Sequence, residues 1–186
     1  MWFVGLAGTD YSFRMRGIDH AGNVEDFTET PESNTSIPDA SVICSSPDTW
    51  DINGNDNSPE NSINVGLLDP PTVHNFCNPL AADRLQDEDW VYFEVENGQA
   101  YLIESQPLAP ETASILELYA ADGTTLLTSA QPEVLNEKSR IIWTADRSEV
   151  VYLRVRHLNG AIAGNIVSYQ LKVNKFLPSF MPFISK

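Results

Sequence analysis

Val150-Val-Tyr-Leu-Arg-Val-Arg-His157 alternates apolar and polar side chains along its length. One face of this segment, when extended, carries Val151, Leu153 and Val155. The opposite face carries Tyr152, Arg154 and Arg156. A period of two is typical of a β-strand with one face in a core and the other toward solvent. The segment therefore predicts a half-buried strand in an antiparallel sheet.

Seven more short segments of similar character flank this one. They are Thr72–Phe76, Trp90–Glu96, Ala100–Ser105, Ser114–Ala121, Thr124–Thr128, Ser139–Thr144 and Ser168–Val173. Asp122-Gly123 separates two of them and is a strong hairpin signal. Residues 79–85 and 132–138 have room for one helical turn each, and no long segment has a period of 3.6. We therefore predict an all-β fold, a jelly-roll-like β-sandwich of about eight short antiparallel strands.

The composition is strongly acidic, with 26 acidic and 11 basic side chains and a formal net charge of −15 in 186 residues. This charge repels phosphate and anionic membranes, which argues against nucleic-acid binding. Hydrophobic residues make up 42% of the chain, which is enough to form a core. No apolar run is long enough to span a membrane. An acidic surface of this kind fits a secreted protein or a host for hard cations such as calcium.

Cys44 and Cys77 are the only cysteines, and the three histidines are scattered, so a zinc site is not indicated. The two cysteines are either buried free thiols or partners in a disulfide. We favour the disulfide, because the surrounding chain has an extracellular character. The bridge would close a loop of 33 residues.

Two segments concentrate oxygen ligands. Residues 48–61 resemble the start of an EF-hand loop, but position six is Asp56 and position twelve is Ser62, so we reject an EF-hand. Residues 83–90 form a second acidic cluster, and the cysteine bridge would bring both segments toward one end of the sandwich. Crowded carboxylates favour a bound cation. The alternative is that both segments are solvated turns. The candidate calcium ligands are Asp51, Asn53, Asp56, Asp87 and Asp89.

Residues 44–174 resemble a bacterial pre-peptidase C-terminal domain. The resemblance is carried by Asp48-x-Trp50-Asp51, Asn55-Asp56, His74-Asn-Phe76, Asp87-x-Asp89-Trp90-Val-x-Phe93, Asn97-Gly98-x-x-Tyr101, Leu116-x-Leu118-Tyr119-x-x-Asp122-Gly123, Ser139-x-Ile141-x-Trp143, Tyr152-x-Arg154-Val155 and Tyr169-x-Leu171-x-Val173. The family motif has glutamate where this chain has Asp51, and Ile52-Asn-Gly54 replaces its proline-containing run. The resemblance implies a non-catalytic domain at the C-terminus of a secreted protease or other exported enzyme. It also implies calcium ligands at Asp51, Asn55, Asp56, Asp87 and Asp89.

The ends of the chain have a different character. Residues 8–25, within a first segment 1–29 that we expect to form two strands and a turn, resemble the last strands of a bacterial fibronectin type III-like domain, through Tyr11-x-Phe13-Arg-x-Arg16 and Gly22-Asn23. This implies a partial second β-domain. Residues 30–43 are polar with two prolines and are predicted to be a linker. Residues 175–186 form an apolar tail that either packs on the sandwich or serves as a docking peptide.

The sequence contains no nucleophile, P-loop or metalloprotease motif, so we expect no enzymatic activity. The polar strand face with Tyr152, Arg154 and Arg156 is the candidate ligand-binding surface. The resulting hypothesis is an extracellular accessory or binding module, calcium-stabilised, in a multidomain bacterial protein. Its partners would be catalytic or repeat domains of the same parent chain and an extracellular polymer, protein or polysaccharide. The alternatives are an adhesive spacer of a cell-surface protein and an appendage removed on maturation.

Overall fold

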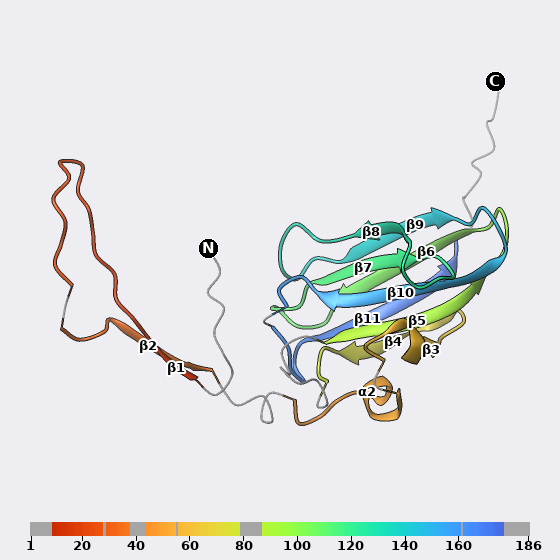
Figure 1. The fold of residues 1–186 in the computed structure, drawn as a ribbon, viewed down its shortest axis with the longest axis horizontal. Coiled ribbons are helices and arrows are strands. Elements are labelled where there is room, and N and C mark those ends of the chain that lie inside the picture. The colour runs from red at the N-terminus through yellow and green to blue at the C-terminus, as the bar shows by residue number, and fades with distance from the viewer. Residues whose placement is uncertain are drawn as a thin grey trace, which may run out of the picture.

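The structure is a computed structural model that describes residues 9–27, 29–37, 44–54, 56–78, 87–160 and 162–176. Two sheets face each other in a β-sandwich, and a separate two-stranded ribbon lies at the N-terminal end (Figure 1). The predicted all-β sandwich is confirmed, and all eight predicted strands are present. The second expected helical segment, residues 132–138, contains turns but no helix. The first, residues 79–85, lies outside the described residues.

The first sheet has five strands in the order β3-β5-β10-β7-β8. Their bounds are β3 Ile63–Asn64, β5 Glu88–Val95, β10 Glu149–His157, β7 Ser114–Tyr119 and β8 Leu126–Ala130. All neighbours are antiparallel except β3, which pairs with β5 in parallel. The two-residue strand β3 was not predicted, because a segment this short carries no periodicity.

The second sheet has four antiparallel strands in the order β4-β11-β6-β9. Their bounds are β4 Leu68–Asn75, β11 Ser168–Lys175, β6 Ala100–Pro107 and β9 Ser139–Thr144. Pro70 and Pro71 lie in the edge strand β4, where missing amide donors do not interrupt a central ladder.

The core is the layer between the two sheets. The inward side chains of β5 and β10 are almost completely buried, as their alternation predicts: Val91, Phe93, Val95, Val151, Leu153 and Val155. They meet inward side chains of the second sheet: Tyr101, Ile103, Tyr169, Leu171 and Val173. Burying a side chain of this size contributes about 1.5–3 kcal/mol, so this layer supplies most of the driving force for the fold.

The predicted hairpin at Asp122-Gly123 is confirmed as the connection between β7 and β8. The Asp122 carboxylate accepts hydrogen bonds from the Thr124 amide (2.9 Å) and the Thr125 amide (2.7 Å). The hydroxyl of Thr125, together with these amides, lowers the pKa of Asp122 to about 2. Gly123 has φ 67°, and a Cβ there would lie 2.8 Å from the Pro59 Cβ, so both backbone and space favour glycine.

The acidic segment after Cys44 begins with an unexpected single turn of helix, α2, Thr49–Gly54. The 3₁₀ helix η1, Pro59–Asn61, follows it. Sequence patterning indicated only loop here, because residues 49–61 are rich in turn-forming Asn and Asp. Local hydrogen bonds of Asp48, described below, outweigh that propensity.

The N-terminal ribbon pairs β1, Thr9–Phe13, with β2, Ser33–Ile37. The second of these strands falls inside residues 30–43, so part of this segment is a paired strand, and its role as a linker stays a prediction. Polar cross-strand pairs account for the register, including the Ser12 hydroxyl donating to the Asn34 side chain (2.7 Å). The expected turn at residues 20–23 is present, with the Ala21 and Asn23 amides donating to the Asp19 carboxylate. The fibronectin type III-like identity of this part stays a prediction.

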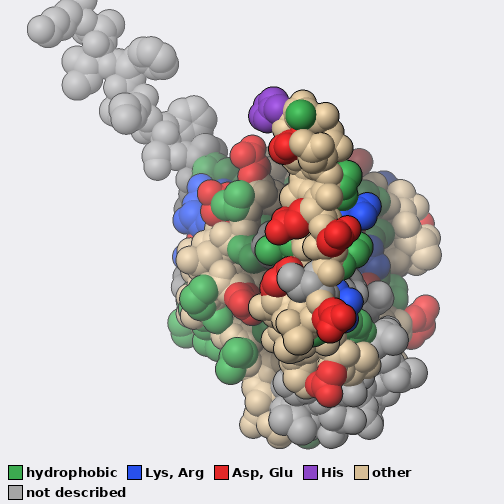
Figure 2. All heavy atoms as spheres, turned by 90° about the vertical axis from the view of Figure 1, so that its left-hand side faces the viewer, with side chains coloured by type: hydrophobic (Ala, Val, Ile, Leu, Met, Phe, Trp, Pro, Cys, Tyr) green, Lys and Arg blue, Asp and Glu red, His purple; other side chains and the backbone are tan. Residues whose placement is uncertain are grey.

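Acidic side chains are spread over the face of the molecule that Figure 2 shows, in keeping with the net charge of −15. Among the described residues, no helix combines the length and hydropathy needed to cross a membrane. The apolar tail beyond residue 176 lies outside the described residues.

Cys44 and Cys77 form a disulfide, with their Cα atoms 5.1 Å apart. The favoured alternative is thus confirmed, and the free-thiol alternative is wrong. Both cysteines are buried. The amides of Ser45 and Ser46 donate to the Asn165 side chain (3.0 and 3.4 Å), which ties this end of the chain to the loop before β11.

Replacing both cysteines, Cys44→Ser with Cys77→Ser, is expected to lower the free energy of unfolding by about 3–4 kcal/mol, because the unfolded chain gains the freedom of an open 33-residue loop. Urea denaturation of oxidised protein measures the difference, and reduced wild type should match the double variant. A loss below about 1 kcal/mol would show that the bridge adds little constraint.

Candidate metal centre

The strand register of β5 carries two acidic residues into the protein. Val91, Phe93 and Val95 point inward, and the same period of two continues backward to Asp89 and Asp87. Asp89 is completely buried and Asp87 is 5% exposed. These two carboxylates lie at the point where the apolar layer of the sandwich ends.

The segment after Cys44 supplies two more buried acids, Asp51 in α2 and Asp56 beyond it. Backbone hydrogen bonds attach this segment to the start of β5. The Trp90 amide donates to the Asp56 carbonyl (2.9 Å), and the Glu88 amide donates to the Asn57 side chain (3.1 Å). The structure thus brings the two predicted acidic segments side by side.

The four aspartates are buried, and most of their carboxylate oxygens have no hydrogen-bond partner among the described residues. Both carboxylate oxygens of Asp51, Asp56 and Asp87 are in this state, and so is one oxygen of Asp89. The second oxygen of Asp89 accepts a hydrogen bond from the Tyr169 hydroxyl. A buried, unpaired carboxylate is expensive, so this concentration of them requires compensation by protons or by a cation.

Burial and mutual repulsion favour the protonated forms when no cation is present. Burial, followed by the charge of Asp87, raises the pKa of Asp51 to about 9. Burial and the nearby Asp56 raise the pKa of Asp87 to about 8. Burial also raises the pKa of Asp56 to about 7, and that of Asp89 well above its usual range. These carboxyls therefore sense one another's charge.

The donor chemistry fits a hard cation, because calcium takes six to eight oxygen ligands and prefers carboxylates and carbonyls. The arrangement, however, is not a finished cage. Within the described ranges, no three acidic, histidine or cysteine side chains converge closely enough to hold a metal ion. The fit therefore rests on the buried, unpaired oxygens.

The predicted ligands are placed as follows. Asp51, Asp56, Asp87 and Asp89 share the buried region described above. Asn53 lies in α2, but its side chain is outside what the structure describes, and Asn55 lies outside the described residues altogether. The ligand role of all six stays a prediction.

Sequence reasoning missed Asp48, which organises the segment. One of its oxygens accepts from the Trp50 amide (2.8 Å), and the other accepts from the Asn75 amide (3.1 Å) and contacts His74 Nδ1 (3.1 Å). Burial raises the pKa of Asp48, but these hydrogen bonds, led by that of His74, lower it below its usual value. The Trp50 ring stacks on His74 with centroids 3.3 Å apart. The alternation of β4, which puts His74 inward two residues before Phe76, was the available signal.

Thr72, His74 and Asp48 lie in a row that resembles a hydrolase relay, with the Thr72 hydroxyl 2.7 Å from His74 Nε2. The His74 ring is 4% exposed and covered by Trp50. A substrate therefore has no access to the ring, and the row attaches α2 to β4. His157 is also buried, and its Nε2 accepts from the Ala113 amide (3.1 Å). Both histidines thus have structural hydrogen-bonding roles.

The candidate ligand surface is only partly open. Tyr152 is half-buried and packs against Tyr92, with ring centroids 6.0 Å apart. Arg154 donates to Glu117 (2.7 Å) and Glu88 (3.3 Å). Its guanidinium lies 5.5 Å from the Trp90 ring centroid. The strand pattern placed these side chains on the outer face, but the ion pairs and aromatic packing hold Arg154 in the structure.

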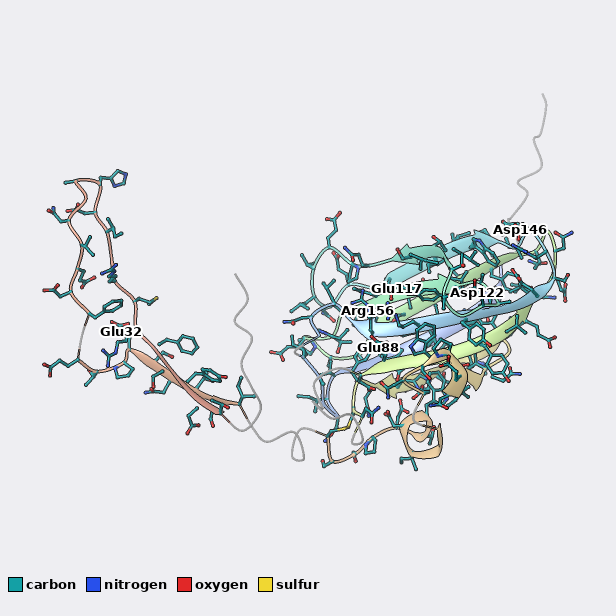
Figure 3. All side chains as sticks on the ribbon, viewed as in Figure 1. Glu32, Glu88, Glu117, Asp122, Asp146 and Arg156 are labelled. Carbon is teal, nitrogen blue, oxygen red and sulfur yellow. A yellow bond between two sulfur atoms is a disulfide. The ribbon has the colours of Figure 1, made fainter. Side chains whose placement is uncertain are left out.

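Arg156 differs from Arg154 in its surroundings. It donates to the same Glu117 carboxylate (3.1 and 3.3 Å) but has no aromatic partner among the described residues. Figure 3 shows Arg156, Glu117 and Glu88 close together on the five-stranded sheet. Of the three candidate binding residues, Arg156 is therefore the one most available to a ligand.

No protein-family model and no curated protein matches the sequence. Among solved structures, the chain is similar to the pre-peptidase C-terminal domain of a collagenase from Bacillus anthracis, with 19% identity and a TM-score of 0.45, covering 63% of this chain and 99% of that chain. It is also similar to a structure of carbohydrate-binding modules from the β-sandwich superfamily, with 11% identity and a TM-score of 0.32, covering 91% and 74%. The first of these structures bears the name of the family that residues 44–174 resemble.

His74→Ala is expected to lower the free energy of unfolding by about 2–3 kcal/mol, because it removes the ring under Trp50 and leaves Asp48 and Thr72 without their partner. Chemical denaturation measures the loss. His20→Ala, in an exposed turn, is the matched control and should change stability by less than about 0.5 kcal/mol. Equal effects of the two substitutions would contradict the structural role of His74.

Stability without metal is expected to fall as the pH rises from 5.5 to 8. Burial raises the pKa of Asp51 and Asp87 above their unfolded values, so the folded chain binds more protons in this window and loses stability as they leave. Scanning calorimetry in EDTA should therefore give a higher Tm at pH 5.5 than at pH 8. Asp89→Asn should flatten the dependence, and exposed Asp146→Asn should not. A Tm that rises with pH in EDTA would show that the buried aspartates do not have raised pKa values in the folded protein.

Proposed function

We propose that this chain is a non-catalytic, calcium-stabilised β-sandwich module that serves a secreted multidomain bacterial protein in an accessory binding role. One observation carries the proposal: Asp51, Asp56, Asp87 and Asp89 are buried together with unpaired oxygens beside the disulfide-linked end of the sandwich. A protein gains nothing from four such groups unless something neutralises them.

Asp51, Asp56, Asp87 and Asp89 would hold the ion, with Asn53 and Asn55 as further oxygen donors from the same segment. Bound calcium would supply positive charge and replace the protons that the carboxyls otherwise retain. Two of the acids come from the α2 segment, one from β5 (Asp89) and one from the residue directly before β5 (Asp87). The ion would therefore fasten these segments to each other, in addition to the hydrogen bond between the Trp90 amide and the Asp56 carbonyl.

An extracellular setting is supported by two features. Disulfides persist in oxidising compartments, and the Cys44–Cys77 bridge is buried within the fold. Millimolar calcium, which an extracellular module encounters, suits a site of moderate affinity. The partners we propose are catalytic or repeat domains of the same parent chain and an extracellular polymer.

A binding role is favoured over catalysis by the state of the polar side chains. His74 and His157 are both buried in structural hydrogen bonds, and Arg154 is held by Glu88 and Glu117. The open polar and apolar surface lies around Arg156 and the loop that follows it.

Calcium is expected to raise the Tm of the full chain at pH 8. A ligand at about 100 times its Kd adds about 2.7 kcal/mol, which corresponds to about 5–10 °C for a domain of this size. Asp87→Asn and Asp89→Asn should abolish this rise. In EDTA the same variants should equal or exceed wild type in Tm, because folding raises the pKa of each carboxyl, which costs stability at pH 8, and asparagine carries no such cost. Differential scanning fluorimetry in EDTA and in millimolar CaCl₂ or MgCl₂ measures these shifts.

The matched control is Asp146→Asn, an exposed residue of the β9–β10 turn that should keep the full calcium response. Comparing the Tm of the variants in EDTA and in CaCl₂ distinguishes the two roles. Replacing a purely structural aspartate would lower the Tm in both buffers, whereas replacing a calcium ligand would lower it only in CaCl₂. Wild-type protein with the same Tm in EDTA and in calcium would rule out the calcium site and leave the aspartates protonated.

A further inference from the structure

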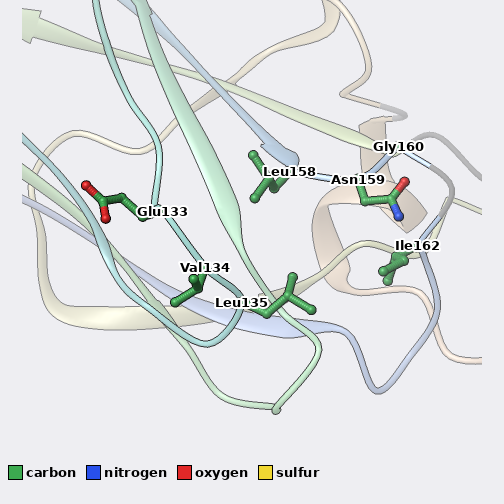
Figure 4. A pocket seen from close by; sticks show the side chains of 7 residues that line it. All are labelled: Glu133, Val134, Leu135, Leu158, Asn159, Gly160 and Ile162. Atoms are coloured by element: carbon green, nitrogen blue, oxygen red, sulfur yellow. The ribbon is translucent and has the colours of Figure 1, made fainter. Parts of the chain in front are cut away.

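Two adjoining pockets lie at the end of β10, and Asp87 of the acidic region is among the residues that line the smaller one. The larger, of about 740 Å³, is formed by the β8–β9 loop and the loop after β10 (Figure 4). The smaller, of about 340 Å³, extends along β10 to Arg156 and Arg154. Gly160 and Ile162 line both, so the two pockets form one continuous depression with an apolar and a polar half.

The apolar half is lined by four aliphatic side chains: Val134, Leu135, Leu158 and Ile162. Val134 is 57% exposed, and Leu135 and Leu158 are half-buried. Ile162 packs against the core. A volume in this range with aliphatic walls suits a large apolar group, and its exposure to water favours an occupant. Among the described residues, no aromatic ring lines it, so this part of the chain offers no flat platform on which sugars stack.

The walls are held in place by one strip of backbone, residues 111–113. The Leu158 amide donates to the Ala113 carbonyl (2.7 Å), and the Ala113 amide donates to His157 Nε2 (3.1 Å). From the other wall, the Asn136 amide donates to the Thr112 carbonyl (2.8 Å). The two loops therefore share an anchor, and the depression exists before any ligand arrives, which reduces the entropy cost of binding.

The polar half selects against an acidic ligand. Arg156 is already paired with Glu117 through two nitrogens, and Arg154 adds Glu88 and Glu117. The remaining guanidinium donors of Arg156 suit a neutral acceptor such as a peptide carbonyl. Glu133 lies at the rim of the apolar half and has no ion pair with a described residue. With a net charge of −15, the chain attracts basic rather than acidic partners.

We propose that this depression binds an extended peptide segment that places one large aliphatic side chain among Val134, Leu135, Leu158 and Ile162, a backbone carbonyl on Arg156 and a basic side chain on Glu133. The inference deepens the proposed binding role and rests on it. None of the three contacts uses one of the four aspartates, although Asp87 lines the smaller pocket. It identifies the ligand as a polypeptide with an aliphatic residue beside a basic one.

The test is a titration of ¹⁵N-labelled full chain with the capped peptide acetyl-Lys-Leu-Lys-amide, followed by NMR. Saturable shifts are expected at millimolar peptide for the amides of Leu135, Leu158 and Ile162. Acetyl-Lys-Gly-Lys-amide lacks the aliphatic group and should cause no saturable shift. Acetyl-Glu-Leu-Glu-amide reverses the charge and should bind more weakly than the basic peptide.

Two surface variants separate the two halves of the recognition. Val134→Asp should abolish saturation, whereas Val73→Asp, similarly exposed on β4, should not. Glu133→Lys should weaken the basic peptide about threefold and strengthen the acidic one. Glu137→Lys makes the same charge change in the same loop outside the pocket and should leave both peptides nearly unchanged.

The inference is overturned if the basic peptide causes no saturable shift, if its shifts persist in Val134→Asp, or if the acidic peptide binds equally well. Preferential binding of octanoate, which is aliphatic but not a peptide, would assign the depression to a small amphiphile instead. All titrations are run in EDTA and in CaCl₂. Peptide binding in both buffers without a calcium-dependent Tm would refute the calcium site alone, and the reverse result would refute the peptide site alone.

Discussion

Along β5 and β10, side chains alternate between the core, where they meet the second sheet, and the outer face. The rest of the structure depends on this alternation. Burying Val91, Phe93 and Val95 against the second sheet fixes the register, because a slip of one residue would turn these side chains to solvent. Once that register is set, the remaining side chains of the strand have no choice of side. Asp87 and Asp89 must point inward, and Glu94 must point outward.

The same hydrophobic burial that stabilises the sandwich therefore also buries carboxyl groups that have few hydrogen-bond partners. Asp89 is carried into the core, where the Tyr169 hydroxyl is the one partner of its oxygens within the described part of the chain. Asp51 and Asp56 approach from the α2 segment, and burial and repulsion raise the pKa values of the set. Asp48 solves the problem differently, because His74 and two amides satisfy it. The contrast between satisfied and unsatisfied aspartates is the physical reason to assign the latter to a cation.

Polar side chains on the outer face of the five-stranded sheet have two roles: some stabilise the sheet, and others are available to a ligand. Arg154 stabilises the sheet through Glu88, Glu117 and the Trp90 ring. Arg156 lies two residues further along β10, where the strand ends and the pocket loops begin. Arg154 lies within the paired part of β10 and stabilises the sheet. Arg156 lies near the end of the strand, where backbone pairing stops and loops can form a concave surface, and it is available to a ligand.

Sequence alone determined the eight longer strands of the sandwich. Eight strands, the Asp122-Gly123 hairpin and the inward faces of β5 and β10 follow from a local period of two, and that period is a property of each segment by itself. It also identified the four aspartates as candidates, since acidic density is visible in one dimension. The tertiary structure alone decided which of their oxygens lack partners, that Asp48 and His74 attach α2 to β4, that β2 pairs with β1, and that the loops around residues 134 and 158 enclose a pocket. Each of these depends on contacts between residues distant in sequence, which no local pattern encodes.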